Sequence, residues 1–181
     1  SITPSDMPEL PEVENVKRSL EQVGVVGRYF AGVEIHAKSL RTPLKKKMDL
    51  DLKGQKLIAV QRRAKFLLFE TEDFVLLNHL GMTGSWRVRQ SREAQIKHDH
   101  VVLNFEKNLQ LVYNDPRRFG LLELMPKEKM PTHPWLKSLG LEPFDERFNG
   151  DFLFQISRGI KAPIKNFIMD QRRLVGVGNI Y

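Results

Sequence analysis

Pro8, Glu9 and Glu12 lie in a segment, Pro-Glu-Leu-Pro-Glu-Val-Glu, whose residue types could do covalent chemistry. As a first residue, Pro8 would offer a free secondary amine beside a carboxylate. An α-amino group has a pKa of about 8, roughly two units below lysine, so more of it is nucleophilic at neutral pH. The alternative is an ordinary helix start, with proline in the first turn and acids at the positive end. Because seven residues precede Pro8, its nitrogen is an amide in this sequence and cannot attack.

Three further segments follow in order along the chain. They read His-Leu-Gly-Met-Thr-Gly over 79–84, Tyr-Asn-Asp-Pro-Arg-Arg-Phe-Gly over 113–120 and Leu-Val-Gly-Val-Gly-Asn-Ile-Tyr over 174–181. Together with the opening segment they resemble formamidopyrimidine-DNA glycosylase, the bacterial base-excision family for oxidised purines. The resemblance runs from Met7 to Tyr181. The sister family, endonuclease VIII, usually has glycine where this chain has Leu10, which favours the purine-repair branch.

The resemblance implies a bifunctional enzyme that excises 8-oxoguanine and formamidopyrimidines and then cleaves the backbone by β,δ-elimination. Pro8 is implied as the nucleophile: its attack on C1′ gives an iminium ion, which acidifies the C2′ proton. Glu9 is implied as the group that moves protons at the sugar oxygen and leaving group. Glu12 is implied to shape the site. Lys65 is implied to hold the phosphates beside the lesion. Without the resemblance, the local pattern would favour an ordinary charged residue at the edge of a strand.

DNA contacts are implied for residues of the two middle segments. Without the resemblance, the local sequence would favour a core histidine for His79 and a side chain folded onto the core for Met82. Arg117 and Phe119 lie two apart, so on an extended segment they would point the same way. The resemblance makes His79 a phosphate ligand and Met82 and Phe119 wedges between bases, and it places Arg117 opposite the lesion.

Two more DNA contacts are implied near the C-terminal end. Glycines around Asn179 allow close backbone approach to a phosphate, although an ordinary helix–helix turn would look the same. Lys165 matches a lysine near the lesion. His98 and His100 could share one face of a strand, but two histidines without a third ligand favour a structural role over a metal site.

Charge and composition limit the class of protein. The 181 residues carry a net charge of +7, and nine lysines or arginines stand against two aspartates between Arg41 and Lys65. Such clusters gain affinity by displacing counterions from phosphates, so a polyanion is the expected partner; the alternative is a solvated basic loop. The sequence contains no apolar run of about 18 residues, so no membrane-spanning helix is predicted, and no leader is recognisable. The absence of cysteine excludes disulfides, a thiolate nucleophile and a cysteine zinc site in this chain.

The periodicities predict an α+β fold, an N-terminal helix with an antiparallel β-sandwich. Val13, Val16, Leu20 and Val23 recur at helical spacing, which predicts a helix over 9–23 ended by Gly24. Apolar runs separated by turns predict strands over 56–61, 65–70, 74–80, 100–105, 109–113 and 119–124. Four prolines between 126 and 144 predict a linker with one short helix near Trp135–Leu139.

We expect four segments: an extension over 1–7, a catalytic β-sandwich domain over 8–125, a linker over 126–148 and an incomplete helical domain over 149–181. The last would be part of a helix–two-turn–helix domain, with helices over 152–158 and 164–170. The resemblance implies that family members continue beyond Tyr181 with a four-cysteine zinc finger, so one zinc ion is expected there and no cofactor in this chain.

The leading hypothesis is a DNA glycosylase and lyase that binds double-stranded DNA with oxidised bases. It is expected to be a monomer in the bacterial cytoplasm, associated with the nucleoid and not with membranes. One alternative is a damaged-DNA-binding fragment that is inactive because Pro8 is blocked. The other is an endonuclease VIII-type pyrimidine glycosylase. The state of the N-terminus separates the first alternative from the enzyme, and a panel of lesion duplexes separates the second.

Overall fold

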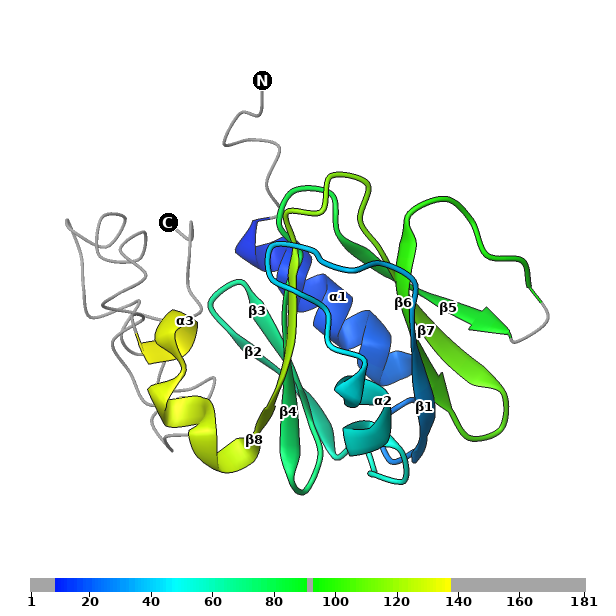
Figure 1. Cartoon of the computed structure of the whole chain (residues 1–181), viewed down its shortest axis with the longest axis horizontal. Coiled ribbons are helices and arrows are strands. Elements are labelled where there is room, and N and C mark those ends of the chain that lie inside the picture. The colour runs from blue at the N-terminus through cyan, green and yellow to red at the C-terminus, as the bar shows by residue number, and fades with distance from the viewer. Residues whose placement is uncertain (1–8, 91–92, 138–181) are drawn as a thin grey trace.

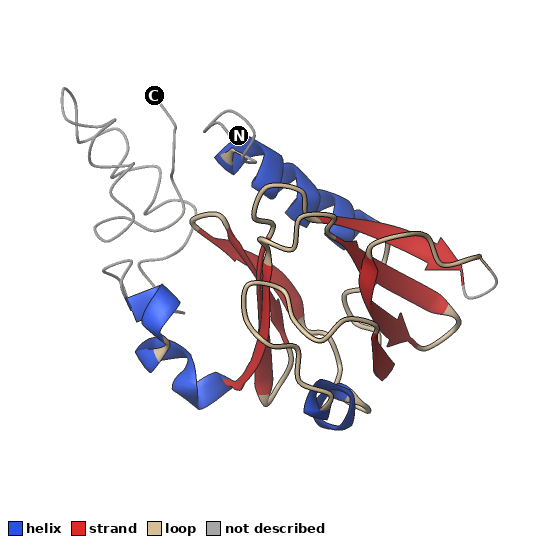
Figure 2. Cartoon of the chain, turned by 45° about the horizontal axis from the view of Figure 1, so that its top comes forward, coloured by secondary structure: helices blue, strands red, loops and turns tan. Residues whose placement is uncertain are grey.

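The computed structural model describes residues 9–90 and 93–137. Within them two four-stranded antiparallel sheets, β1-β6-β7-β5 and β2-β3-β4-β8, face each other, and helix α1 (Leu10–Gln22) crosses one end of the sandwich (Figures 1 and 2). The α+β class with an N-terminal helix is thereby confirmed. The remaining elements are β1 (Phe30–Ile35), α2 (Lys47–Leu52), β2 (Ala59–Arg63), β3 (Phe66–Glu70), β4 (Phe74–His79), β5 (Ser85–Gln90), β6 (Asp99–Phe105), β7 (Leu109–Asn114), β8 (Leu121–Pro126), the 3-10 helix η2 (Lys127–Thr132) and α3 (Pro134–Lys137).

Helix α1 begins with a reciprocal cap. Glu9 is the N-cap, its side chain accepts from the backbone of Glu12, and its own N–H donates to Oε2 of Glu12 at 3.1 Å. This capping box satisfies two N–H groups that the first turn leaves free. Leu10, Val13 and Leu20 are buried, and Gly24, at φ +85°, takes the left-handed conformation that follows the helix end. The helix predicted over 9–23 is confirmed.

The main hydrophobic core fills the space between the sheets. Trp86 packs on Phe69 and on Tyr113, with ring centroids 5.1 and 5.0 Å apart. Asn78 is fully buried beside them: its Oδ1 accepts from Trp86 Nε1 at 2.9 Å and its Nδ2 donates to the carbonyl of Leu121 at 3.0 Å. The amide therefore ties β4 and β8 of one sheet to β5 of the other.

A second hydrophobic cluster covers the outer face of the β2-β3-β4-β8 sheet. Met130 and Leu136, from η2 and α3, are buried against side chains that include Phe66 and Leu77, and Trp135 packs at its margin. Residues 127–137, predicted to begin a linker, are thus two helical turns that complete the packing of this sheet, and α3 confirms the short helix expected there. The division into domains stays a prediction, since residues 138–181 lie outside the described part.

Four elements were not predicted, and one strand starts later than expected. None of strand β1, strand β5, helix α2 and the 3-10 helix η2 was expected from the sequence. Helix α2 lies inside the segment interpreted as a basic loop. The strand predicted over 119–124 begins at Leu121, because Arg118 has φ +59° and the segment before it forms a loop.

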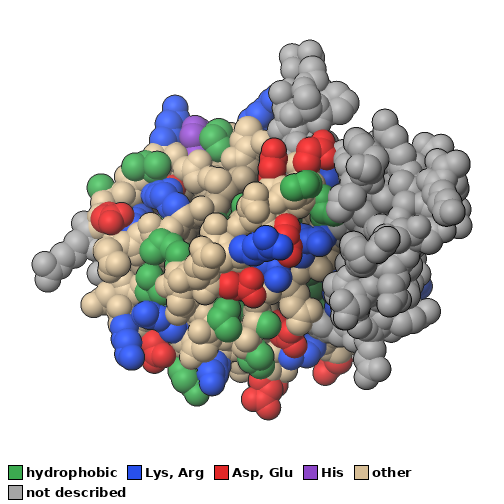
Figure 3. All heavy atoms as spheres, turned by 180° about the vertical axis from the view of Figure 1, so that it is seen from behind, with side chains coloured by type: hydrophobic (Ala, Val, Ile, Leu, Met, Phe, Trp, Pro, Cys, Tyr) green, Lys and Arg blue, Asp and Glu red, His purple; other side chains and the backbone are tan. Residues whose placement is uncertain are grey.

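Charges of both signs are mixed on the face seen from behind, so the excess of positive charge is not gathered there (Figure 3). In the described residues no helix is long and apolar enough to cross a membrane.

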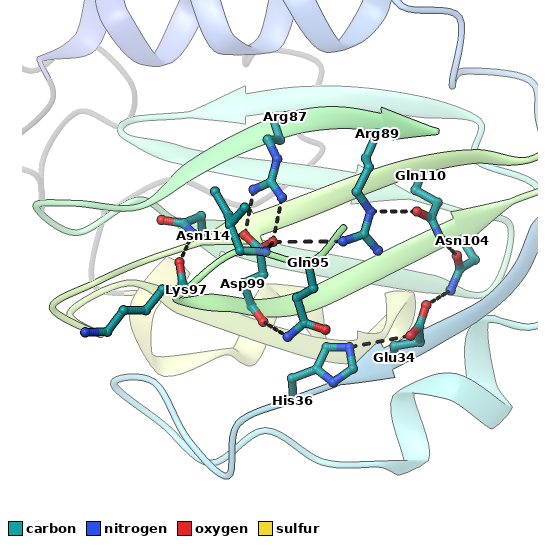
Figure 4. Close-up of polar contacts among 11 residues, drawn as sticks. Glu34, His36, Arg87, Arg89, Gln95, Lys97, Asp99, Asn104, Gln110 and Asn114 are labelled. Carbon is teal, nitrogen blue, oxygen red and sulfur yellow. Dashed lines mark hydrogen bonds and ion pairs between the residues drawn. The ribbon is translucent and has the colours of Figure 1, made fainter. Parts of the chain in front are cut away.

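The outer face of the other sheet carries a polar layer (Figure 4). Asp99 is almost fully buried there and accepts both guanidinium arms of Arg87, at 2.6 and 2.5 Å, together with Asn114 Nδ2 and the Ile96 N–H, both at 2.9 Å. Burial alone would raise the pKa of Asp99, but the hydrogen bonds from Arg87, Asn114 and Ile96 hold that pKa well below its usual range. This layer fixes the segment that leads into β6.

Candidate active site and nucleic-acid interface

The start of α1 meets the turn between β2 and β3. Ala64 turns the chain with φ +54°, and Lys65 follows it in the turn, just before β3 begins at Phe66. The Nζ of Lys65 lies 3.6 Å from Oε2 of Glu9, and Lys65 is only 8% exposed. The fold therefore brings together two of the predicted catalytic residues, 56 positions apart in the sequence. Glu12 touches the same place through the helix cap, whereas Pro8 lies outside the described residues.

His79 ends β4 beside this ion pair in an environment that disfavours its charged form. Burial, and then the charges of Arg41 and Lys65, lower the pKa of His79 to about 4. Its Nδ1 accepts the Gly81 N–H at 3.0 Å, which assigns the proton of the neutral ring to Nε2. At neutral pH His79 is therefore an uncharged donor that stands between two cations.

Arg41 and Trp135 were not predicted to belong to the site. The N–H of Arg41 donates to the carbonyl of Gly120 at 3.0 Å, and its guanidinium lies 5.2 Å from the centre of the Trp135 ring. Trp135 packs edge-on against Phe66, whose ring also meets that of His79. Arg41 opens the basic segment of the sequence, but nothing in that segment indicates which of its nine cations lies beside His79.

Two loops carry the residues predicted to enter DNA, and they pack backbone to backbone. Gly81 has φ +61°, and a Cβ built on it would lie 2.6 Å from the nitrogen of Gly120 and from the carbonyl carbon of Phe119. Only glycine fits here, so the turn that carries Met82 rests against the loop after β7. Met82 is half-buried on that turn.

Arg117 and Phe119 lie side by side although their segment is a loop and not an extended strand. The guanidinium of Arg117 is 5.2 Å from the centre of the Phe119 ring, and Phe119 is 40% exposed. An exposed apolar ring is the kind of side chain that can insert between base steps, and the cation beside it is attracted to the face of the ring. Asp115, at the base of this loop, was missed in the sequence because an aspartate before proline reads as an ordinary turn residue.

The two histidines considered for a metal do not share a strand face. His98 lies before β6 with φ +74°, and only His100 is in the strand, where its Nε2 is 2.9 Å from the carbonyl of Asp115. The chain turns at His98, so the two residues do not share a strand face, although their rings lie 6.1 Å apart. No group of three or more possible ligands lies among residues 9–90 and 93–137. Lys165 and Asn179 fall outside those residues, so their roles stay predictions.

Comparison with known families shows to which family the chain belongs. Residues 7–122 match the family described as formamidopyrimidine-DNA glycosylase N-terminal domain. The chain belongs to this family. Formamidopyrimidine-DNA glycosylases of Bdellovibrio bacteriovorus and Stenotrophomonas maltophilia are 45% and 46% identical to it over 175 residues. In each case the match covers 97% of this chain and 64% of the relative, so the chain spans about two thirds of their length.

Solved structures of the family are also similar to this chain in sequence and in fold. The Lactococcus lactis FPG protein in complex with DNA containing FAPY-dG is 34% identical, with a TM-score of 0.71, over 96% of this chain and 65% of that one. The same protein bound to DNA with an abasic site gives a TM-score of 0.72 at the same identity and coverage. At this similarity the described residues share the family's fold.

Proposed function

We propose that the protein containing this chain is a bifunctional DNA glycosylase and abasic-site lyase that acts on oxidised purines. The observation that carries the proposal is the ion pair between Glu9 and Lys65 at the start of α1, directly after Pro8, in a chain of this family. The relatives bound to FAPY-dG and abasic DNA support the substrate class.

Pro8 performs the covalent step once its nitrogen is free. The secondary amine attacks C1′, the bond to the base breaks, and the base leaves with a proton. The C1′–O4′ bond then breaks, O4′ takes up a proton, and the ring-opened sugar is held as an iminium. The iminium acidifies the C2′ proton, and loss of that proton expels the 3′ phosphate; a second elimination expels the 5′ phosphate. In the printed sequence Pro8 follows seven residues, so activity requires their removal.

Glu9 and Lys65 are placed to serve this step. The carboxylate of Glu9 follows Pro8 in the chain and supplies or accepts the proton at the sugar oxygen and the leaving base. The ammonium of Lys65, held 3.6 Å from Glu9, neutralises a phosphate that flanks the lesion. Glu12 keeps Glu9 in place through the helix cap.

The remaining contacts bind the duplex. His79 donates Nε2–H to a phosphate, with the charge of Arg41 beside it. Met82 and Phe119 fill the space that an extruded base leaves, and Arg117 faces the orphaned base. Lys165 and Asn179 would bind further phosphates. The protein would act as a monomer in the bacterial cytoplasm, on the nucleoid.

The zinc finger implied by the family would lie outside this chain. There is no cysteine in the sequence, and the described residues do not offer a metal-binding group. The residues present therefore do not fit a zinc ion, and no step of the mechanism passes through one.

Borohydride trapping tests the proposal. Intact mass first establishes whether Pro8 is the N-terminus; reduction with lesion DNA should then cross-link the protein at Pro8, and Pro8→Gly should greatly weaken the cross-link. A cross-link that maps to Lys65 while Pro8 is free and intact would refute the assigned nucleophile. Duplexes with oxidised purine or oxidised pyrimidine lesions, compared in the same assay, test the substrate class.

A further inference from the structure

Asp115 lies at the base of the two loops that carry Met82, Arg117 and Phe119, and it is fully buried. Each of its oxygens accepts two hydrogen bonds. Oδ1 accepts from Thr83 Oγ1 at 2.6 Å and from the Arg118 N–H at 3.1 Å. Oδ2 accepts from Tyr113 Oη at 3.1 Å and from the Gly120 N–H at 2.9 Å. An ionised carboxylate accepts only, so these four neutral donors use the whole capacity of the group.

One of these bonds joins the two loops. Thr83 belongs to the turn between β4 and β5, whereas the other three donors belong to Asp115's own segment. The hydroxyl of Thr83 also accepts the N–H of Arg117 at 3.0 Å. A continuous path therefore runs from the backbone of Arg117 through Thr83 to Asp115, and it spans the contact where Gly81 meets Gly120.

The same carboxylate holds an unusual backbone shape. Arg118 has φ +59°, which a residue with a side chain adopts only when its surroundings hold it there. The bonds from the N–H groups of Arg118 and Gly120 to Asp115 fix the chain on both sides of Phe119. The Phe119 ring and the Arg117 guanidinium thus start from one fixed position relative to each other.

We propose that Asp115 is a positioning residue that, through Thr83, locks the turn of Met82 and the loop of Arg117 and Phe119 into one rigid wedge. The inference rests on the proposed function, because it concerns entry of this wedge into DNA. It assigns no contact with DNA to Asp115 or Thr83. Its physical basis is preorganisation: a wedge that is already ordered loses less conformational entropy when it enters the base stack.

Thr83→Val is the sharpest test, because it removes the hydroxyl at nearly constant shape. Thr83→Ser keeps the hydroxyl and should restore the parent behaviour. Thr132→Val is a control of the same substitution: its hydroxyl donates to a backbone carbonyl, that of Lys129, outside both loops. Asp115→Asn is the second variant. Each oxygen of Asp115 serves one hydroxyl, which can rotate, and one N–H, which cannot, so either orientation of the amide leaves one N–H facing a donor.

Two measurements on the protein that contains this chain decide the inference. Amide exchange in the free protein should rise about tenfold or more at Arg117, Arg118 and Gly120 in Thr83→Val and Asp115→Asn. Single-turnover excision from duplex DNA should fall about tenfold, while cleavage at a pre-formed abasic site falls less than about twofold, because there the lesion no longer needs to be extruded.

Unchanged exchange, or a loss at the abasic site equal to the loss on the lesion duplex, would overturn the inference. The second result would assign Thr83 and Asp115 a general structural role. If the parent protein neither excises a base nor is trapped on DNA, the proposed function fails, and amide exchange alone then decides whether Asp115 locks the two loops.

Discussion

In the proposed function, His79 would bind a phosphate without being a cation. Burial and two neighbouring positive charges make the neutral ring the favoured form, and the Gly81 N–H occupies its only acceptor. The Nε2–H can then donate a hydrogen bond to an anion that Arg41 and Lys65 attract. A neutral donor costs less to bury than a third positive charge, so the three side chains can crowd together before a phosphate arrives.

The lowered pKa of His79 predicts how stability depends on pH. The folded pKa of about 4 lies below the value of 6.5 for a free histidine, so the unfolded chain takes up a proton first. Stability from this residue is present above pH 6.5 and is lost as the pH falls to 4. The loss should be on the order of 2 kcal/mol after allowance for partial exposure. Urea unfolding of His79→Gln should therefore show a flatter pH dependence than the parent over this interval; parallel curves would contradict it.

Lys65 should contribute to DNA binding through charge alone. Lys65→Ala should weaken binding to lesion and undamaged duplexes alike and reduce the slope of log affinity against log salt by about one. Lys107→Gln, in the exposed hairpin between β6 and β7 and outside the basic segment, is the control that keeps the parent slope. Titrations at several salt concentrations measure both slopes. An unchanged slope for Lys65→Ala would rule it out as a phosphate ligand.

Arg117 should read the base opposite the lesion. Its guanidinium is a planar fork of donors that keeps its charge, and Phe119 holds it from one side. Arg117→Ala should reduce the ratio of excision rates between duplexes with cytosine and with adenine opposite the lesion. Single-turnover rates on duplexes that differ only in that base give the ratio. A ratio equal to the parent's, in a folded variant, would remove Arg117 from this role.

At the scale of elements, the sequence predicted buried strands and missed those whose polar residues lie on a sheet face. Strand β5 reads Ser-Trp-Arg-Val-Arg-Gln, so it has no apolar run of the kind from which the other strands were predicted. In the fold Trp86 packs against the core, while Arg87 and Arg89 join the polar layer around Asp99. That layer exists only when β5 and β6 are in the same sheet, so no local pattern could indicate it.

Asn78 makes an element-level prediction because it joins both sheets. Asn78→Ala leaves the buried Nε1–H of Trp86 and the carbonyl of Leu121 without their partner. Each buried group left unpaired costs about 1–3 kcal/mol, so unfolding should become easier by about 2–4 kcal/mol. Asn104→Ala, on the outer polar layer, is the comparison and should cost less than about 1 kcal/mol. Denaturant unfolding measures both. Equal losses would mean that the link between the sheets adds nothing.

At the scale of the whole molecule, the site is assembled from segments far apart in the chain. The resemblance supplied the residue types, and the fold places Glu9, Lys65 and His79 near one another. Arg41 and Asp115 could not be predicted, because their roles come from tertiary contacts: one with the carbonyl of Gly120, the other with a hydroxyl 32 positions earlier. Sequence patterns report what a residue can do, and they do not report which distant residue it meets.

The two tryptophans of the chain allow a test of whether residues 9–137 fold as one unit. Trp86 lies against the core between the sheets, and Trp135 lies against the second cluster beneath η2 and α3. The β2-β3-β4-β8 sheet separates the two clusters and contributes buried side chains to both, so loss of either should unfold the other. Trp86→Phe and Trp135→Phe leave one reporter each, and Met130→Ala, which empties a buried position, should lower stability by about 2–5 kcal/mol. Fluorescence-detected urea unfolding should show Met130→Ala moving both reporters to a lower midpoint by the same amount. If only the Trp135 signal moves, η2 and α3 form a cap that opens independently of the sandwich, and the sheet does not couple the two clusters.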